Sequence, residues 1–208
     1  MAGARRKGVF ISIEGLDGSG KDTQIEILER RSELQGAIFT REPGGTDTGV
    51  EIRSIILSQR ITPLTTEAEL LLFLAARAEL VGKVIRPALE AGKIVVSNRF
   101  GLSTTAYQIY GRQRPDLLPL LQELSAQIVG ADVPHYVLLD VPAAVVEERT
   151  KNRGALTPFD VSPLEFHERV RRGFLAHVHD HAKSVVIDGT QSPEKVAEEV
   201  WKAVSSWL

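Results

Sequence analysis

The sequence predicts a three-layer α/β/α fold built on a five-stranded parallel sheet. Apolar runs of strand length occur five times along the chain, at residues 9–14, 37–41, 93–98, 135–140 and 184–188. Longer segments with the apolar spacing of helices lie between these runs. Short buried strands that alternate with helices are typical of a parallel sheet with right-handed crossovers, in which helices cover both faces.

Helices are expected at residues 21–32, 50–57, 68–90, 103–110, 115–129, 142–150 and 163–179, and a last one begins at Ser192-Pro193. The segment 68–90 has the broad apolar face of a helix that packs on a core. Pro142 fits the first helical position of its segment, where no N–H is needed. The sequence has no internal repeat and no linker, so residues 8–208 are expected to form one domain after a flexible leader of residues 1–7.

The composition narrows the class of protein. The 208 residues are 43% hydrophobic and 25% charged, with a formal net charge of −2. This balance is typical of a soluble globular protein and argues against a general nucleic-acid binder. The sequence has no apolar run long enough for a membrane span or a signal peptide, which predicts a cytoplasmic protein. Because cysteine is absent, disulfides, thiolate–zinc sites and cysteine nucleophiles are excluded.

The strongest single motif follows the first strand. Gly15, Gly20 and Lys21 fit the spacing G-x-x-x-x-G-K between a strand and a helix, which is the pattern of a phosphate-binding loop. Glycines let backbone N–H groups converge on phosphate oxygens, and Lys21 is expected to reach the β- and γ-phosphates. The residues predicted to hold ATP here are Gly15, Leu16, Asp17, Gly18, Ser19, Gly20, Lys21, Asp22 and Thr23.

Several further strings occur in one order along the chain. They are FTREPGGT (39–46), GVEIR (49–53), LLFLAARAEL (71–80), SNRF (97–100), STTAYQ (103–108), LLDVP (138–142), FHERVRRGFL (166–175) and IDGTQ (187–191). Together with the loop, they resemble the thymidylate kinase family of nucleoside monophosphate kinases over residues 8–208. The resemblance implies a P-loop NTPase fold with a mobile lid. It also implies transfer of the γ-phosphoryl group of MgATP to dTMP, giving dTDP.

For dTMP, the resemblance implies contacts at both ends of the nucleotide. Arg53 and Arg99 resemble two arginines that grip the phosphate, and two planar guanidinium groups suit a dianion. Phe73 resembles an aromatic side chain that stacks on thymine, and Arg77, four residues later, is expected to bond the base edge. The other implied contacts are Asp17 at the 3′-hydroxyl, Glu42 near the acceptor phosphate and the metal, and Ser103, Thr104, Tyr107 and Gln108 at thymine and sugar.

For ATP, the resemblance implies a lid. Some members of the family carry an arginine where this chain has Gly18, and the others supply that cation from a lid, here about residues 149–162. Arg153 is expected to contact the transferring phosphoryl group and Arg149 to stack on adenine, although an ordinary basic helix end would look the same. Gln191 resembles the residue that holds the adenine edge. The catalytic set is therefore predicted as Lys21, Asn98, Arg99 and Arg153.

Two positions depart from the family pattern near the expected Mg²⁺. The family has Asp where this chain has Asn98, and Ser or Thr where it has Asp22. We interpret this as a carboxylate moved from one side of the metal to the other, with Asp22 and Glu42 as the candidate metal ligands. A weakly active or inactive pseudokinase of the same fold fits the same two residues.

Other functions stay open at this point. They are a kinase for another acceptor, such as dUMP, dCMP or a deoxynucleoside, and a P-loop ATPase that acts as a binding module. The family also implies a homodimer formed through the long helices, and the apolar face of residues 68–90 is compatible with one. No nucleic-acid or membrane partner is expected.

Overall fold

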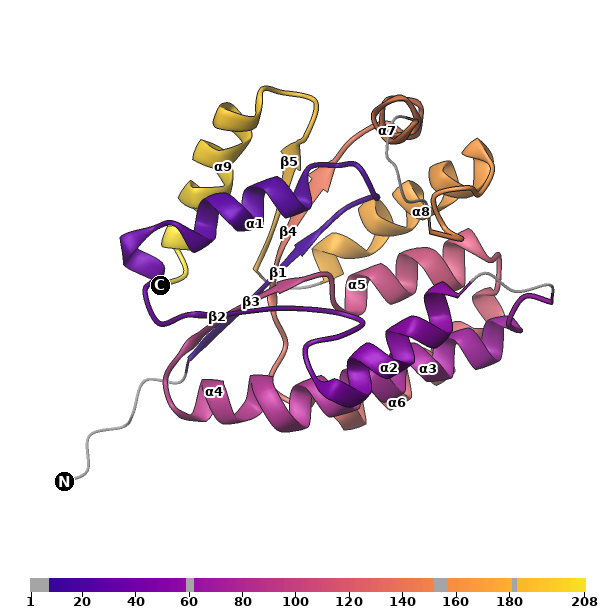
Figure 1. Cartoon of the computed structure of the whole chain (residues 1–208), viewed down its shortest axis with the longest axis horizontal. Coiled ribbons are helices and arrows are strands. Elements are labelled where there is room, and N and C mark those ends of the chain that lie inside the picture. Colours follow the sequence, from indigo (N-terminus) through magenta and orange to yellow (C-terminus); the bar gives the residue numbers. More distant parts are fainter. Residues whose placement is uncertain (1–7, 59–61, 152–156, 181–182) are drawn as a thin grey trace.

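The computed structural model describes residues 8–58, 62–151, 157–180 and 183–208. Its centre is a five-stranded sheet with the order β2-β3-β1-β4-β5, in which every pairing is parallel (Figure 1). The strands are β1 (Val9–Glu14), β2 (Ile38–Arg41), β3 (Ile94–Asn98), β4 (His135–Asp140) and β5 (Ser184–Asp188). The five predicted strands and the parallel sheet are confirmed.

Nine α-helices occur in the described parts of the chain. They are α1 (Lys21–Glu29), α2 (Asp47–Leu57), α3 (Thr66–Leu80), α4 (Arg86–Glu90), α5 (Gly101–Thr104), α6 (Leu118–Val129), α7 (Ala143–Thr150), α8 (Leu164–His177) and α9 (Pro193–Ser205). Short 3-10 turns are formed by Ser32–Leu34, Pro115–Leu117 and Val178–Asp180. Two π-helical segments, Val81–Ile85 and Thr105–Gly111, continue α3 and α5.

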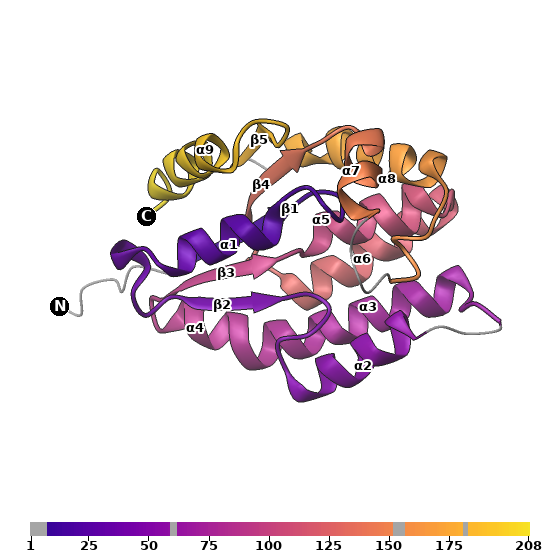
Figure 2. The same ribbon diagram turned by 45° about the horizontal axis from the view of Figure 1, so that its top comes forward.

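The helices form the two outer layers (Figures 1 and 2). One layer is α1 with α9, whose Leu28 and Val200 share a buried cluster with Ile11 of β1. On the other face, α3 and α4 cover β1 and β3, and α8 packs on the helix formed by α5 and its π extension. In Figure 2, α2 lies outside α3. The expected three-layer arrangement is therefore present.

The predicted helix 68–90 is one continuous helical segment, but its hydrogen-bonding pattern changes along its length. The α-helical pattern of α3 changes to a π turn over Val81–Ile85 and resumes in α4. Pro87 explains the change, because it has no N–H to donate to the preceding turn. The predicted helix ends at 32 and 179 were also placed too late, since α1 ends at Glu29 and α8 at His177, each followed by a 3-10 turn. Pro142 precedes the first helical residue of α7 and is not part of it.

The topology places polar residues at one edge of the sheet. All strands are parallel, so their carboxyl ends, Glu14, Arg41, Asn98, Asp140 and Asp188, share this edge. The connection from β3 to β4 passes over β1, so the strand order reverses at β1. Ligands of open α/β sheets bind at the carboxyl edge where such a reversal occurs. The predicted loop after β1 and the Asn98-Arg99 pair after β3 therefore meet at the position where a ligand is expected.

None of the helices in the described part of the chain is long and apolar enough to cross a membrane.

Candidate functional site

The loop between β1 and α1 has the backbone of a phosphate cradle. Gly15 and Gly20 have φ angles of 142° and 97°, which side-chain-bearing residues rarely adopt. A Cβ atom on Gly15 would lie 2.6 Å from the carbonyl oxygen of Leu139. Helix α1 starts directly at Lys21, and no side chain caps its first N–H groups. These donors and the positive end of the helix dipole can therefore bind an anion.

The side chain of Lys21, the first residue of α1, reaches back into this loop. This side chain is buried, and Nζ donates to the carbonyl oxygen of Leu16 at 2.6 Å. Burial, followed by the charge of Arg99, lowers the pKa of Lys21 to about 7. A phosphate beside Nζ would favour the charged form, because an opposite charge stabilises an ionised group. The loop and its lysine thus fit the predicted contact with polyphosphate.

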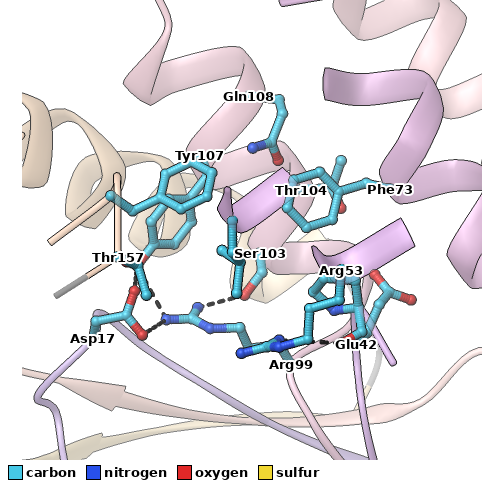
Figure 3. Close-up of a pocket in the computed structure, with 13 residues that line it drawn as sticks. Asp17, Glu42, Arg53, Phe73, Arg99, Ser103, Thr104, Tyr107, Gln108 and Thr157 are labelled. Carbon is cyan, nitrogen blue, oxygen red and sulfur yellow. Dashed lines mark hydrogen bonds and ion pairs between the residues drawn. The ribbon is translucent and has the colours of Figure 1, made fainter. Parts of the chain in front are cut away.

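A pocket opens next to the loop, with about 520 Å³ of empty space that is partly open to solvent. Its walls come from the loop, α2, α3 and α5 with its π extension, and from the segment after residue 156 (Figure 3). The lining residues are Asp17, Glu42, Pro43, Arg53, Leu57, Phe73, Arg99, Ser103, Thr104, Tyr107, Gln108, Thr157 and Phe159.

Two arginines bring positive charge to this pocket. Arg99 has a left-handed backbone, with φ at 69°, a conformation that is uncommon outside glycine and clusters at functional sites. Its guanidinium donates to Asp17 and Ser103 at 2.8 Å each (Figure 3). Arg53, on α2, donates to the carbonyl oxygen of Pro43 at 3.1 Å. Burial, followed by the charge of Arg41, lowers the pKa of Arg53.

Asp17 balances this charge at the mouth of the loop. Burial raises the pKa of its carboxyl group, but the charges of Arg99 and Lys21 outweigh burial and hold the pKa well below its usual range. Tyr107 also donates a hydrogen bond to Asp17 at 3.2 Å. Asp17 is therefore ionised near neutral pH, and it orients Arg99 by a salt bridge.

Behind the pocket lies a buried ion pair. Arg77 is fully buried, and its Nε lies 3.0 Å from one oxygen of Glu42 while its Nη2 lies 2.5 Å from the other. Nη2 also donates to Thr104 at 2.5 Å. Arg77 does not line the pocket: it lies behind Glu42 and Thr104, which do. Direct contact of Arg77 with a base stays a prediction, while its contact with two pocket residues is observed.

The two residues that depart from the family pattern contact each other. Nδ2 of Asn98 donates to Oδ1 of Asp22 at 2.7 Å. The carboxylate and the amide therefore lie side by side between the end of β3 and the first turn of α1. Oxygen donors of this kind suit a hard cation such as Mg²⁺. Glu42, the other predicted metal ligand, has its carboxylate engaged by Arg77.

Arg149 and Gln191, the residues predicted to hold adenine, lie at the turn after β5. Both Nη1 and Nη2 of Arg149 donate to the carbonyl oxygen of Gly189 at 3.1 Å, so the end of α7 is tied to the turn after β5. The amide of Gln191 donates to the backbone of Asp188 and to Glu199 of α9, at 3.1 Å each. Arg153 lies outside the described residues.

The comparisons with known proteins match almost the whole chain. The family model described as thymidylate kinase matches residues 13–200. The chain belongs to the thymidylate kinase family. A thymidylate kinase of Deinococcus radiodurans is 40% identical over 205 residues, covering 96% of this chain and 97% of that protein. One of Solidesulfovibrio magneticus is 43% identical over 211 residues, covering 96% of this chain and 100% of that protein.

A solved structure agrees with this assignment to the thymidylate kinase family. The crystal structure of thymidylate kinase from Ehrlichia chaffeensis matches with a TM-score of 0.74 at 32% identity, covering 95% of this chain and 99% of that one. The resemblance read from the sequence and the P-loop fold it implied are thus confirmed.

Sequence reasoning missed several residues of the site. Pro43 and Leu57 line the pocket. Their places in the sequence could have indicated them, because Pro43 follows Glu42 and Leu57 lies one helical turn after Arg53. Thr157 and Phe159 also line it, and no periodic pattern marks them. Of the ten residues predicted for dTMP, all except Arg77 line this one pocket.

Glu14 is a further residue that the sequence did not point to. It ends β1, is fully buried, and accepts hydrogen bonds from Ser12, Ser103 and the backbone N–H of Phe100. Burial raises the pKa of Glu14 to about 7, although these hydrogen bonds act to lower it. The side chain thus joins the strand before the loop to the helix that carries Ser103. A glutamate at the end of an apolar strand gives no sign of this in the sequence.

Proposed function

We propose that this chain phosphorylates dTMP to dTDP with MgATP as the donor. The observation that carries the proposal is the joint geometry of the loop and the pocket. Lys21 lies in the loop, and Arg53 and Arg99 line the adjacent pocket, so a polyphosphate and a monophosphate can lie end to end. The acceptor of the transfer is then a phosphate oxygen of dTMP, which attacks the γ-phosphorus while the bond to the β-phosphate oxygen breaks.

In this step the protein mainly positions the two nucleotides and neutralises the charge of their phosphates, as expected for phosphoryl transfer. Arg53 and Arg99 neutralise the acceptor phosphate, so that it can approach a second anion. Lys21 neutralises charge on the donor side, where the phosphate itself favours its protonated form. Asp17 holds Arg99 in place through the salt bridge of 2.8 Å.

The remaining lining residues are proposed to hold the nucleoside of dTMP. Phe73 presents an aromatic ring in the pocket and Tyr107 lies opposite, near Asp17 (Figure 3). Ser103, Thr104 and Gln108 provide hydrogen-bonding groups from the same helix as Tyr107. A flat, polar-edged base fits between these walls. Glu42 lines the pocket, and Arg77 holds its carboxylate from behind.

For the donor, residues 15–23 are proposed to cradle the phosphates of ATP. Arg149 and Gln191 flank the turn after β5 and are proposed to contact adenine. We also keep the lid, about residues 149–162, and Arg153 as its contact to the transferring phosphoryl group. Residues 8–208 would then act as one domain.

Mg²⁺ is proposed to bind beside Asp22. The carboxylate and the neighbouring amide of Asn98 fit the oxygen chemistry that Mg²⁺ prefers, whereas Glu42 is engaged by an arginine. When bound, the ion would neutralise charge on the phosphates of ATP. The exchange hypothesis predicts that Asp22→Thr and Asn98→Asp each lower the rate of ADP release with dTMP and MgATP. The double variant should be more active than the worse single variant, and the exchange is rejected if it is not.

An ADP-release assay tests the proposed function directly. With MgATP, release is expected to depend on added dTMP, and a panel with dUMP, dCMP and thymidine then ranks the acceptors. Release of ADP without an acceptor would point to an ATPase. No release under any condition would point to a pseudokinase, and either result rejects the proposal.

A cytoplasmic homodimer is also proposed. Large apolar side chains are exposed on α2 and α3, with Val50 at 58% and Leu71 at 51% exposure. Exposed apolar patches often mark contacts between chains. Sedimentation of the protein at several concentrations, with Leu71→Lys as the disrupting variant, tests the dimer, and cell fractionation tests the location.

A further inference from the structure

A polar relay lies behind one wall of the pocket. Gln108 lines the pocket and is almost fully buried, and its Nε2 donates to Oε1 of Glu69 at 3.0 Å. Glu69, on α3, is buried as well. Arg112 holds the same carboxylate from the other side, with Nη2 at 2.8 Å from Oε2 and Nε at 3.2 Å from Oε1. The three side chains therefore form a chain from the protein surface to the pocket.

The chemistry of Glu69 fixes which end of the Gln108 amide faces the pocket. An ionised carboxylate accepts hydrogen bonds and cannot donate them, so the amide must turn its nitrogen toward Glu69. This removes the usual ambiguity between the two ends of an amide. The amide oxygen then lies on the side away from Glu69, and Figure 3 shows it turned toward Phe73 and Thr104. In the described part of the chain, no side chain donates to this oxygen.

Arg112 keeps this arrangement in place. Its two bonds to Glu69 have the bidentate form of an arginine–carboxylate pair, which fixes orientation as well as charge. Its guanidinium also lies 5.5 Å from the ring of Phe159, which lines the same pocket. The relay thus connects Gln108 with Phe159, a second residue of the pocket lining.

We propose that Glu69 and Arg112 are positioning residues that make Gln108 select pyrimidine nucleotides with an N3–H group. This inference rests on the proposed function. A fixed acceptor oxygen can bond the N3–H of thymine or uracil, whereas cytosine presents a bare acceptor nitrogen at the same place. Two acceptors face to face leave a buried polar group unpaired, which is a strong means of rejection. Phe73 provides stacking that any pyrimidine can use, so the discrimination comes from the amide.

The test compares dTMP with dCMP in variants that free the amide. Glu69→Gln can accept or donate, so the Gln108 amide can turn round and present its nitrogen to cytosine. The ratio of kcat/KM for dTMP over dCMP is expected to fall roughly tenfold, the net worth of about one hydrogen bond. Arg112→Lys loses the bidentate grip at the surface end and should lower the ratio in the same direction by less.

A matched control comes from the same helix. Glu67 pairs with Arg114 and is half exposed, so Glu67→Gln makes the same chemical change away from the pocket and should leave the ratio unchanged. Glu69→Gln should also have no effect on the ratio in a Gln108→Leu background, since the relay acts through Gln108. Thermal melting of each variant shows that it is folded.

Two outcomes separate this inference from the proposed function. A wild-type protein that phosphorylates dTMP, with the same ratio in Glu69→Gln and Arg112→Lys as in Glu67→Gln, overturns the relay alone. A wild-type protein that uses no nucleoside monophosphate overturns the proposed function and the relay with it. Equal losses for dTMP and dCMP in Glu69→Gln would show a merely structural role and also overturn the inference.

Discussion

The ion pair behind the pocket allows a quantitative prediction about Arg77→Met. Both members of the pair are almost fully buried, with side-chain exposures of 0% for Arg77 and 2% for Glu42. Burial raises the pKa of Glu42, and the charge of Arg77 acts against this effect. Without Arg77 only burial remains, so the stranded carboxyl group will take up a proton in the folded state.

The cost of that proton sets the magnitude. A carboxyl group with an ordinary pKa of 4.5 must be protonated against the pH of the solution, which costs about 1.4 kcal/mol per pH unit. At pH 7 this amounts to about 3.4 kcal/mol, and at pH 5.5 to about 1.4 kcal/mol. Loss of the hydrogen bond to Thr104 adds a further cost that does not depend on pH. In the wild type, two N–H groups of Arg77 hold the carboxylate of Glu42 in its ionised form. The destabilisation of Arg77→Met should therefore shrink by about 2 kcal/mol between the two pH values.

Urea denaturation followed by tryptophan fluorescence measures this difference, with Trp201 and Trp207 as the reporters. Wild type and variant are compared at one chain concentration and at both pH values, because assembly would also change apparent stability. The double variant Arg77→Met/Glu42→Gln has no carboxyl group to protonate, so its deficit should be the same at both pH values. An equal deficit for Arg77→Met at both pH values would refute the reasoning.

Three further predictions concern the loop and the phosphate site. The folded-state pKa of Glu14, about 7 against an ordinary 4.5, means that the folded protein binds more protons between these values. Stability should thus fall as pH rises through this window, and Glu14→Gln should remove about 3 kcal/mol of that dependence in urea titrations; an unchanged slope contradicts this. Gly15→Ala forces a Cβ against the carbonyl of Leu139 and should lower stability by about 1–3 kcal/mol and abolish tight MgATP binding, so unchanged calorimetric titrations would count against the cradle. Arg53→Lys keeps the charge but loses the planar guanidinium, so dTMP affinity should fall about tenfold with MgATP affinity unchanged, and parallel losses for both ligands would argue against a separate acceptor site.

The sequence was a good guide to the strands and the loop. Strands 135–140 and 184–188 appear with the predicted bounds, because runs of apolar residues between polar turns leave few alternatives. The loop at Gly15 was equally clear, since its glycines and lysine follow a strand directly. The interior of the long helix was harder to predict. The π turn at Val81–Ile85 results from the N–H group that Pro87 lacks, and apolar spacing does not reveal this.

The depth of charged residues could not be predicted. Phe73 and Arg77 are four residues apart in one helix, which suggested that both face one pocket, but only Phe73 lines it. Only the fold brings Glu42 into contact with Arg77, so nothing in the sequence places Arg77 inside the protein. The same holds for Glu14 and Glu69. Apart from Ser12, the partners of Glu14 lie 86 to 89 residues away in sequence, and those of Glu69 lie 39 to 43 residues away.

Binding of a bisubstrate ligand tests the central geometry most directly. The ligand joins adenosine and deoxythymidine through one chain of phosphates, so that it spans the loop and the pocket at once. Calorimetry is predicted to give one ligand per chain and an affinity above that of either nucleotide alone, with the gain lost in Arg53→Lys. An affinity no higher than that of ATP alone would contradict the end-to-end placement of the two nucleotides.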